Sequence, residues 1–294
     1  MRANAVGELR HFSYTIEAMT RRDLFATMGA LSLAGAQPVP RKGRLKQAAT
    51  RGCFGRGLAI EDVAREAARL GLKGVDLVGE SDWPVLKKYG LLPTMVPAAG
   101  HSLTDGINRK ERHDAIEPPF REMLIKAAEA GAPNIIVLSG NRRGMSDAEG
   151  AENCAAFLSR VKALAEDKGI TICLELLNSK VNHPDYQCDH TAWGVEVMKR
   201  VNSPRVKLLY DIYHMQIMEG DLIRTIRQNI AYIGHFHTAG NPGRNEIDSS
   251  QELNYRAIAL AIVDAGFTGY LAHEYGPRKD PLKSLAEAIE ICDV

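Results

Sequence analysis

Four side chains that commonly bind divalent metals stand at the ends of apolar runs in the sequence. Glu175 ends the run ITICLE, Asp211 ends VKLLYD, His237 ends YIGHFH and Glu274 ends YLAHE. Three carboxylates and one imidazole suit Mn²⁺, Mg²⁺ or Co²⁺ better than they suit a structural zinc site. The sequence therefore predicts a divalent-metal site with Glu175, Asp211, His237 and Glu274 as its ligands.

Each of these residues, taken alone, also has an ordinary structural explanation. Glu175 can accept backbone hydrogen bonds at a strand end, and His237 can be a satisfied core histidine, like its neighbour His235. The combination favours a shared metal site over separate structural roles, because four such side chains end four successive strand-like runs. In an α/β barrel these ends share one face, and that face carries the chemistry.

Two further residues extend the predicted site. His214 follows Asp211 by three residues, and Arg244 follows His237 by seven in the loop AGNPGR. We predict that both bind substrate oxygens, because an imidazole can donate to a hydroxyl and a guanidinium suits a carboxylate. The alternatives are a His214 that pairs with a backbone carbonyl and an Arg244 that is solvated in its loop.

Strand-like and helix-like segments alternate along most of the chain, and glycine closes several of the helices. Eight of each over about 250 residues predict an α/β protein with the (β/α)8 TIM-barrel fold. A doubly wound open sheet is the alternative, but no G-x-G-x-x-G motif follows the first strand. The predicted strands are 47–53, 74–78, 92–96, 134–138, 170–175, 206–211, 232–237 and 270–274. The predicted helices are 60–70, 83–89, 112–130, 148–168, 191–201, 219–229, 253–265 and 281–291.

The composition narrows the class of protein and of partner. Hydrophobic residues make up 45% of the 294 and charged residues 25%, as in soluble globular proteins. The formal net charge of +1 gives no electrostatic reason to expect a nucleic acid or a membrane as a partner. Five scattered cysteines without a C-x-x-C pair predict reduced thiols. A small-molecule substrate is therefore expected, and a homo-oligomer is left open.

The N-terminal region has the features of an export signal. Translation from Met1 or from Met19 would place Arg21 and Arg22 before a run of small apolar residues that ends in Ala-Gly-Ala. This order is that of a twin-arginine signal with its cleavage site. We expect a signal over 1–36, a linker over 37–45, a barrel over 46–294 and a periplasmic or exported protein. The alternative is a cytoplasmic protein whose first helix begins with two arginines.

Several longer motifs resemble one known family. The stretches CLELLN, YDIYHMQIMEGD, NIAYIGHFHTAGNPGRNEID and GYLAHEYGP are similar to those of the hydroxypyruvate isomerase family. That family belongs to the xylose-isomerase-like TIM barrels, with ketose 3-epimerases as close relatives. The resemblance extends from about residue 47 to the C-terminus and is densest after Glu175.

The resemblance implies a metal-dependent isomerase that converts a small α-hydroxycarbonyl compound through an enediol. Glu175 and Glu274 would move the proton and also bind the metal, with Asp211 and His237 as its other ligands. His214 and Arg244 would bind substrate oxygens. Hydroxypyruvate to tartronate semialdehyde is the leading reaction; a ketose 3-epimerase or a related sugar-modifying enzyme of the same superfamily is the alternative.

Two other classes of protein are alternatives to a metal-dependent isomerase. An AP endonuclease of the same superfamily would need more His, Asp and Glu ligands and a basic surface for DNA, which a net charge of +1 does not favour. A periplasmic binding protein would result if the metal site were broken. The metal content of the purified protein separates that last class from an enzyme.

Overall fold

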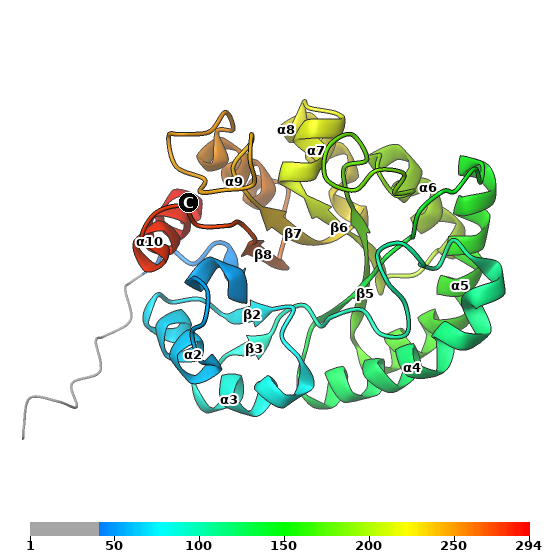
Figure 1. Cartoon of the computed structure of the whole chain (residues 1–294), viewed down its shortest axis with the longest axis horizontal. Coiled ribbons are helices and arrows are strands. Elements are labelled where there is room, and N and C mark those ends of the chain that lie inside the picture. Colours follow the sequence, from blue (N-terminus) through cyan, green and yellow to red (C-terminus); the bar gives the residue numbers. More distant parts are fainter. Residues whose placement is uncertain (1–40) are drawn as a thin grey trace, which may run out of the picture. The chain divides into compact units, whose positions relative to one another are not determined.

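The computed structural model describes residues 41–294. The predicted signal over 1–36 and part of the predicted linker lie outside these residues. Within 41–294, eight parallel strands form one sheet with the order β3-β2-β1-β8-β7-β6-β5-β4 (Figure 1). The strands are β1 (Lys46–Thr50), β2 (Gly74–Asp76), β3 (Leu92–Pro93), β4 (Asn134–Val137), β5 (Thr171–Leu176), β6 (Val206–Asp211), β7 (Ile233–Thr238) and β8 (Tyr270–His273).

The two edges of the sheet meet beyond β3, which closes the barrel. Val96 forms a parallel bridge with Ile135 of β4; its N–H donates to Asn134 O at 2.9 Å and its carbonyl accepts from Ile136 N–H at 3.0 Å. β3 is shorter than the predicted 92–96, because proline cannot donate to a strand neighbour and Pro93 is already the second residue of β3. The (β/α)8 prediction is confirmed, and the open-sheet alternative is wrong.

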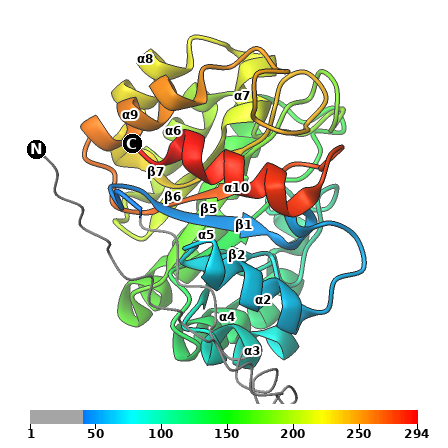
Figure 2. The ribbon, with the colours of Figure 1, turned by 90° about the vertical axis from the view of Figure 1, so that its left-hand side faces the viewer.

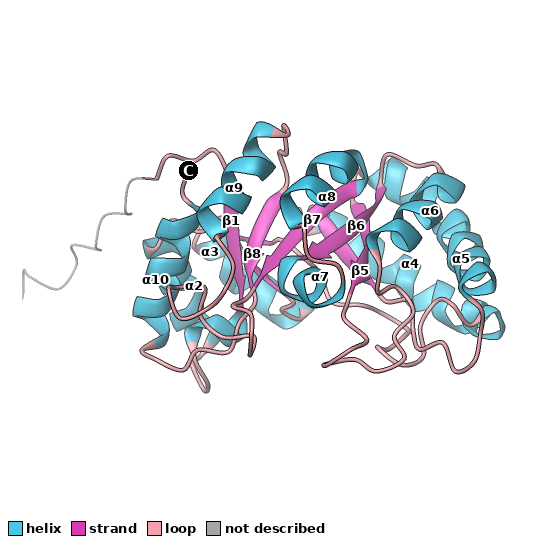
Figure 3. Cartoon of the chain, turned by 90° about the horizontal axis from the view of Figure 1, so that it is seen from above, coloured by secondary structure: helices cyan, strands magenta, loops and turns pink. Residues whose placement is uncertain are grey.

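Helices surround the strands in the described part of the chain (Figure 3). α5 shows why they begin and end where they do: the Ser146 hydroxyl accepts from Glu149 N–H at 3.2 Å, and Gly169 ends the helix at φ 69°. The α-helices are α2 (Ile60–Arg69), α3 (Trp83–Lys88), α4 (His113–Glu129), α5 (Asp147–Lys168), α6 (Thr191–Val201), α7 (Ile212–Met218), α8 (Leu222–Asn229), α9 (Tyr255–Asp264) and α10 (Pro281–Cys292).

The connection after β6 differs from the prediction. A single helix was expected over 219–229, but two helices occur, and the first begins directly at the end of β6. Asp211 caps it by accepting from His214 N–H at 3.1 Å. Gly220 and Asp221 then adopt left-handed φ values of 66° and 44°, which break the helix before α8. Asp211 is therefore both a strand end and a helix cap, and the cap contact fixes one of its two carboxylate oxygens.

The last helix fastens the first strand. Figure 2 shows α10 beside β1, and the side-chain amide of Gln47 donates to Ile289 O at 3.1 Å. The main core lies between strands and helices, whereas Met95, Ile136, Cys173 and Leu209 pack together as a separate buried cluster. All five cysteines are free and buried, as expected. Among residues 41–294, no helix is both long and apolar enough to cross a bilayer.

Candidate metal centre and active site

The four predicted ligands come together at the C-terminal end of the barrel. Glu175 lies in β5, Asp211 ends β6, His237 lies in β7, and Glu274 directly follows β8. One ligand atom from each residue lies within 4.8 Å of the others. Asp211 and His237 are 1% and 0% exposed, so these groups meet away from bulk water. The placement on adjacent parallel strands follows from the register, which pairs Asp211 with His237 directly.

His237 has one nitrogen available for this cluster. Its Nε2–H donates to the Asp76 carboxylate at 3.1 Å, which leaves the Nδ1 atom facing Glu274 at 3.0 Å and Glu175 at 3.8 Å. Nδ1 of His237 and Oδ2 of Asp211 are buried atoms that have no hydrogen-bond partner within the described residues. Carboxylate and imidazole atoms that converge in a buried site without hydrogen-bond partners suit a cation, so the set fits a divalent metal.

His214 lies directly behind Asp211. Its Nδ1 accepts from Asn178 N–H at 3.1 Å, so the proton of the neutral ring is assigned to Nε2. That Nε2 atom is 3.6 Å from Oδ2 of Asp211. Burial lowers the pKa of His214 to about 4, which keeps the ring neutral at pH 7. Its predicted role in substrate binding stays a prediction, and the geometry directs its N–H toward a metal ligand.

Arg244 approaches the cluster from the loop after β7. Its guanidinium donates to Glu274 at 2.7 Å and lies 3.8 Å from Asp211. The backbone at Arg244 has φ 57°, which is rare for a residue with a side chain. Such backbone strain is concentrated at functional sites, where it aims a side chain. Arg244 thus reaches the same atoms that would bind a metal.

The two glutamates differ in their electrostatic environment. Burial, followed by the charge of Glu274, raises the pKa of Glu175 to about 8. Burial opposes the charge of Glu274 too, but His237 and Arg244 outweigh it and lower the pKa of Glu274 to about 2. Two carboxylates with pKa values pushed apart are typical of acid–base pairs.

A cavity of about 310 Å³ opens at the glutamates. Four of its lining residues are polar and belong to the cluster or stand beside it: Glu175, His183, Arg244 and Glu274. The other lining side chains are apolar: Leu77, Pro97, Ala98, Leu103, Ile136, Leu138 and Leu177. A ligand in this cavity would therefore meet its polar partners at one end and a hydrocarbon wall elsewhere.

Three functional candidates escaped the sequence analysis. Asp76 ends β2 and bonds to His237, His235 donates to Asp76 at 2.7 Å, and His183 lines the cavity. Asp76 offered a signal, because it is a carboxylate in the middle of an otherwise apolar strand-like run, GVDLV. His183 lies in the loop NHPDYQ, where no periodic pattern indicates the direction of a side chain.

These features define a class of protein: an α/β barrel with a metal-competent, acid–base-competent cluster at the C-terminal ends of its strands. The chain belongs to the family described as "Xylose isomerase-like TIM barrel", which matches residues 64–293.

Relatives within this class include named isomerases. A putative hydroxypyruvate isomerase of Homo sapiens is 33% identical over 177 residues, which are 57% of this chain and 64% of the relative. A 2-oxo-tetronate isomerase of Cupriavidus necator is 33% identical over 169 residues, 55% of this chain and 64% of the relative. The resemblance to hydroxypyruvate isomerases is confirmed, although each of these matches spans less than two thirds of the relative.

Solved structures share the barrel. An AP endonuclease, family 2, from Brucella melitensis superposes with a TM-score of 0.74 at 26% identity, covering 83% of this chain and 97% of that chain. A 3-keto-D-glucoside 4-epimerase from E. coli superposes with a TM-score of 0.70 at 23% identity, covering 84% and 98%. The epimerase shows the fold alone.

Proposed function

We propose that this protein is a divalent-metal-dependent isomerase of a short 2-oxo acid that carries a hydroxyl on the next carbon. Hydroxypyruvate, converted to tartronate semialdehyde, is the simplest such substrate. The observation that supports this most is the cluster of Glu175, Asp211, His237 and Glu274, whose buried donor atoms face one another at the base of a small cavity. The named isomerases among the relatives agree with this chemistry.

The four ligands would hold Mn²⁺, Mg²⁺ or Co²⁺. A divalent cation bound there supplies positive charge beside the carbonyl and hydroxyl oxygens of the substrate, which acidifies the intervening C–H and stabilises an enediolate. One of the paired glutamates removes the proton from C3, and a proton is returned at C2 by the other. The hydroxyl proton moves from O3 to O2, so atoms and charge balance.

Arg244 suits the carboxylate of such a substrate. Its guanidinium already donates to one carboxylate, that of Glu274, at 2.7 Å from a position beside the cavity. A substrate carboxylate could take over part of that hydrogen bonding if Glu274 bound a metal. His183 also lines the cavity and can donate to a substrate oxygen.

The cavity favours the short acid over the alternative, a sugar 3-epimerase substrate. A ketohexose carries several hydroxyls beyond the two oxygens next to the reacting carbon. Against the leucine, isoleucine, proline and alanine wall these hydroxyls would lose hydrogen bonds to water without replacement. Each such loss costs about 1–3 kcal/mol, which is enough to discriminate against the longer sugar.

DNA cleavage, suggested by the name of the Brucella structure, has less support. Within residues 41–294, the carboxylates and imidazoles that could hold a metal form this four-ligand set and the Asp76, His235 and His237 set, which shares His237. A formal net charge of +1 adds little attraction for a polyanion.

The test is proton exchange in D₂O with the metal-loaded protein. We expect deuterium at carbon from solvent, and isomer formation, with hydroxypyruvate or 2-oxo-tetronate. Ketohexoses and a 3-keto-glucoside form the comparison panel. Faster exchange with a sugar than with every 2-oxo acid would favour the epimerase, and exchange with none of them would contradict an enediol enzyme.

A further inference from the structure

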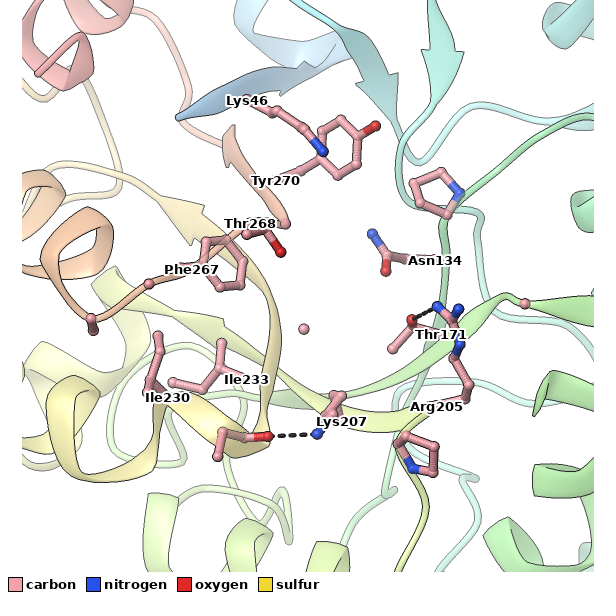
Figure 4. Close-up of a pocket in the computed structure, with 18 residues that line it drawn as sticks. Lys46, Asn134, Thr171, Arg205, Lys207, Ile230, Ile233, Phe267, Thr268 and Tyr270 are labelled. Atoms are coloured by element: carbon pink, nitrogen blue, oxygen red, sulfur yellow. Dashed lines mark hydrogen bonds between the residues drawn. The ribbon is translucent and has the colours of Figure 1, made fainter. Parts of the chain in front are cut away.

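A column of buried polar side chains runs from the N-terminal end of the barrel to the metal centre. Asn134 of β4 lines a cavity of about 520 Å³, which also takes in the first residues of β1, β5, β7 and β8 (Figure 4). Its amide Nδ2 donates to Nδ1 of His235 at 3.2 Å. His235 Nε2–H donates to Asp76 at 2.7 Å, and His237 Nε2–H donates to the same oxygen at 3.1 Å. All four side chains are buried.

Asp76 is the centre of this column. Its carboxylate is 0% exposed and accepts from two imidazole N–H groups, while its other oxygen accepts from the Thr94 hydroxyl. These three hydrogen bonds favour the ionised carboxylate even though burial opposes its charge. Asp76 of β2 is thus held by two histidines of β7 and by Thr94, which follows β3.

The trio of Asp76, His235 and His237 is a poor second metal site. The Asp76 oxygen and His235 Nε2 are 2.7 Å apart, a hydrogen-bond distance. Two ligands on one tetrahedral ion with bonds near 2.1 Å lie about 3.4 Å apart. In addition, if both sites held an ion, His237 would have to bind one ion through each ring nitrogen. Neither nitrogen could then carry a proton. Protons shared between nitrogen and oxygen account for the geometry better.

We infer that Asp76 is a positioning residue for the proposed metal centre: it fixes the proton of His237 on Nε2, so that the Nδ1 lone pair points at the metal. His235 donates to the same oxygen of Asp76, and Asn134 orients His235 by donating to its Nδ1. The inference rests on the proposed function, because it assigns Asp76 a purpose at the same metal site. A neutral imidazole has two tautomers of similar energy, and only one of them leaves Nδ1 free for a cation.

Asp76→Asn tests this arrangement. The amide keeps one accepting oxygen, and with its N–H₂ group in place of Oδ2 the two imidazole N–H groups lose the acceptor that they share. His237 is then free to carry its proton on Nδ1, which blocks the metal. We expect the dissociation constant for Mn²⁺, measured by calorimetry, to rise about 10–100-fold, the usual loss when such a partner is removed.

Asp189→Asn is the matched control. Asp189 is also a buried carboxylate with strong partners, Arg142 at 2.8 Å and Ser179 at 2.5 Å, but it does not touch a predicted ligand. We expect it to change the unfolding free energy and to leave the dissociation constant for Mn²⁺ within about twofold of the wild type. Equal weakening of metal binding in both variants would overturn the inference in favour of general destabilisation.

A second measurement uses the wild-type protein, so the test does not depend on whether Asp76→Asn folds. With ¹⁵N-labelled histidine and diamagnetic Mg²⁺, we expect the His237 signal, assigned by its loss in His237→Gln, to show a proton on Nε2 and none on Nδ1. A proton on Nδ1 instead would overturn the inference. If the wild type binds no divalent metal, the proposed function fails, whereas a proton on Nε2 hydrogen-bonded to Asp76 would still support the positioning.

Discussion

Replacing Glu175 with glutamine should stabilise the metal-free protein at neutral pH while weakening metal binding. The pKa of Glu175 is about 8 in the fold, against an ordinary value of 4.5. Between pH 4.5 and 8, the unfolded chain therefore releases a proton that the folded protein retains. Stability from this group is fully present below pH 4.5 and is lost as pH rises toward 8.

The magnitude follows from the pH interval over which the two states differ. From pH 4.5 to 7, each unit contributes about 1.36 kcal/mol, so the folded state loses on the order of 3 kcal/mol at pH 7. At pH 5 the same loss is below about 1 kcal/mol. Glutamine has nearly the same shape and never ionises, so Glu175→Gln should recover this free energy. The gain is a sizeable part of the 5–15 kcal/mol typical of a folded protein.

The assay is urea unfolding of protein stripped with a chelator, at pH 5 and pH 7. We expect Glu175→Gln to unfold at higher urea than the wild type at pH 7 and at nearly equal urea at pH 5. Glu196→Gln, an exposed glutamate paired with Arg200, is the control and should change little at either pH. Saturating Mn²⁺ should reverse the order, because the carboxylate of the wild type binds the cation more tightly than the neutral amide does. A Glu175→Gln variant less stable than the wild type at pH 7 without metal would refute the reasoning.

Three further predictions address the ligands, the substrate and export. Asp211→Asn and His237→Ala should lower metal content and turnover together, because each alters a ligand; full metal retention in both variants would contradict the assignment. Arg244→Met should raise KM for a 2-oxo acid about 10–100-fold through the lost charged hydrogen bond, and an unchanged KM would exclude Arg244 from carboxylate binding. We also propose that the chain is exported, so N-terminal sequencing after expression in a host with the twin-arginine pathway should find the protein cleaved near Ala36. A mature chain that still contains Arg21 and Arg22 would refute the signal.

The sequence was enough to predict the barrel because local patterns and barrel geometry agree. Each strand reads as an apolar run between glycine-capped helices, and such runs in parallel register must bring their ends to one face. Glu175, Asp211 and His237 were therefore predictable as neighbours without any contact information. The boundaries were less predictable: β3 is shorter than 92–96 because proline lacks an N–H, and the unpredicted helix α7 precedes 219–229 because Asp211 caps a helix directly after β6.

The partners behind the ligands could not be predicted in the same way. Asp76 is 161 positions from His237 in sequence, and their contact depends on how the interior of the closed barrel is filled. No spacing rule reports which interior side chains meet across a barrel. His183 is similar, because an irregular loop sets its direction toward the cavity. Sequence patterns thus identify residues at strand ends, whereas the supporting contacts require the fold.

The most direct test of the account is hydrogen exchange by metal-replete variants of the two glutamates. Glutamine keeps an oxygen for the metal but cannot accept a proton, so metal occupancy is measured first and matched to the wild type. We predict that Glu175→Gln and Glu274→Gln each lose turnover of the best 2-oxo acid by about 10²–10⁴-fold. The variant that lacks the first base should also lose exchange of the substrate C–H with D₂O, while the other retains some exchange without product. Near-wild-type turnover by both metal-replete variants would contradict proton transfer between paired carboxylates.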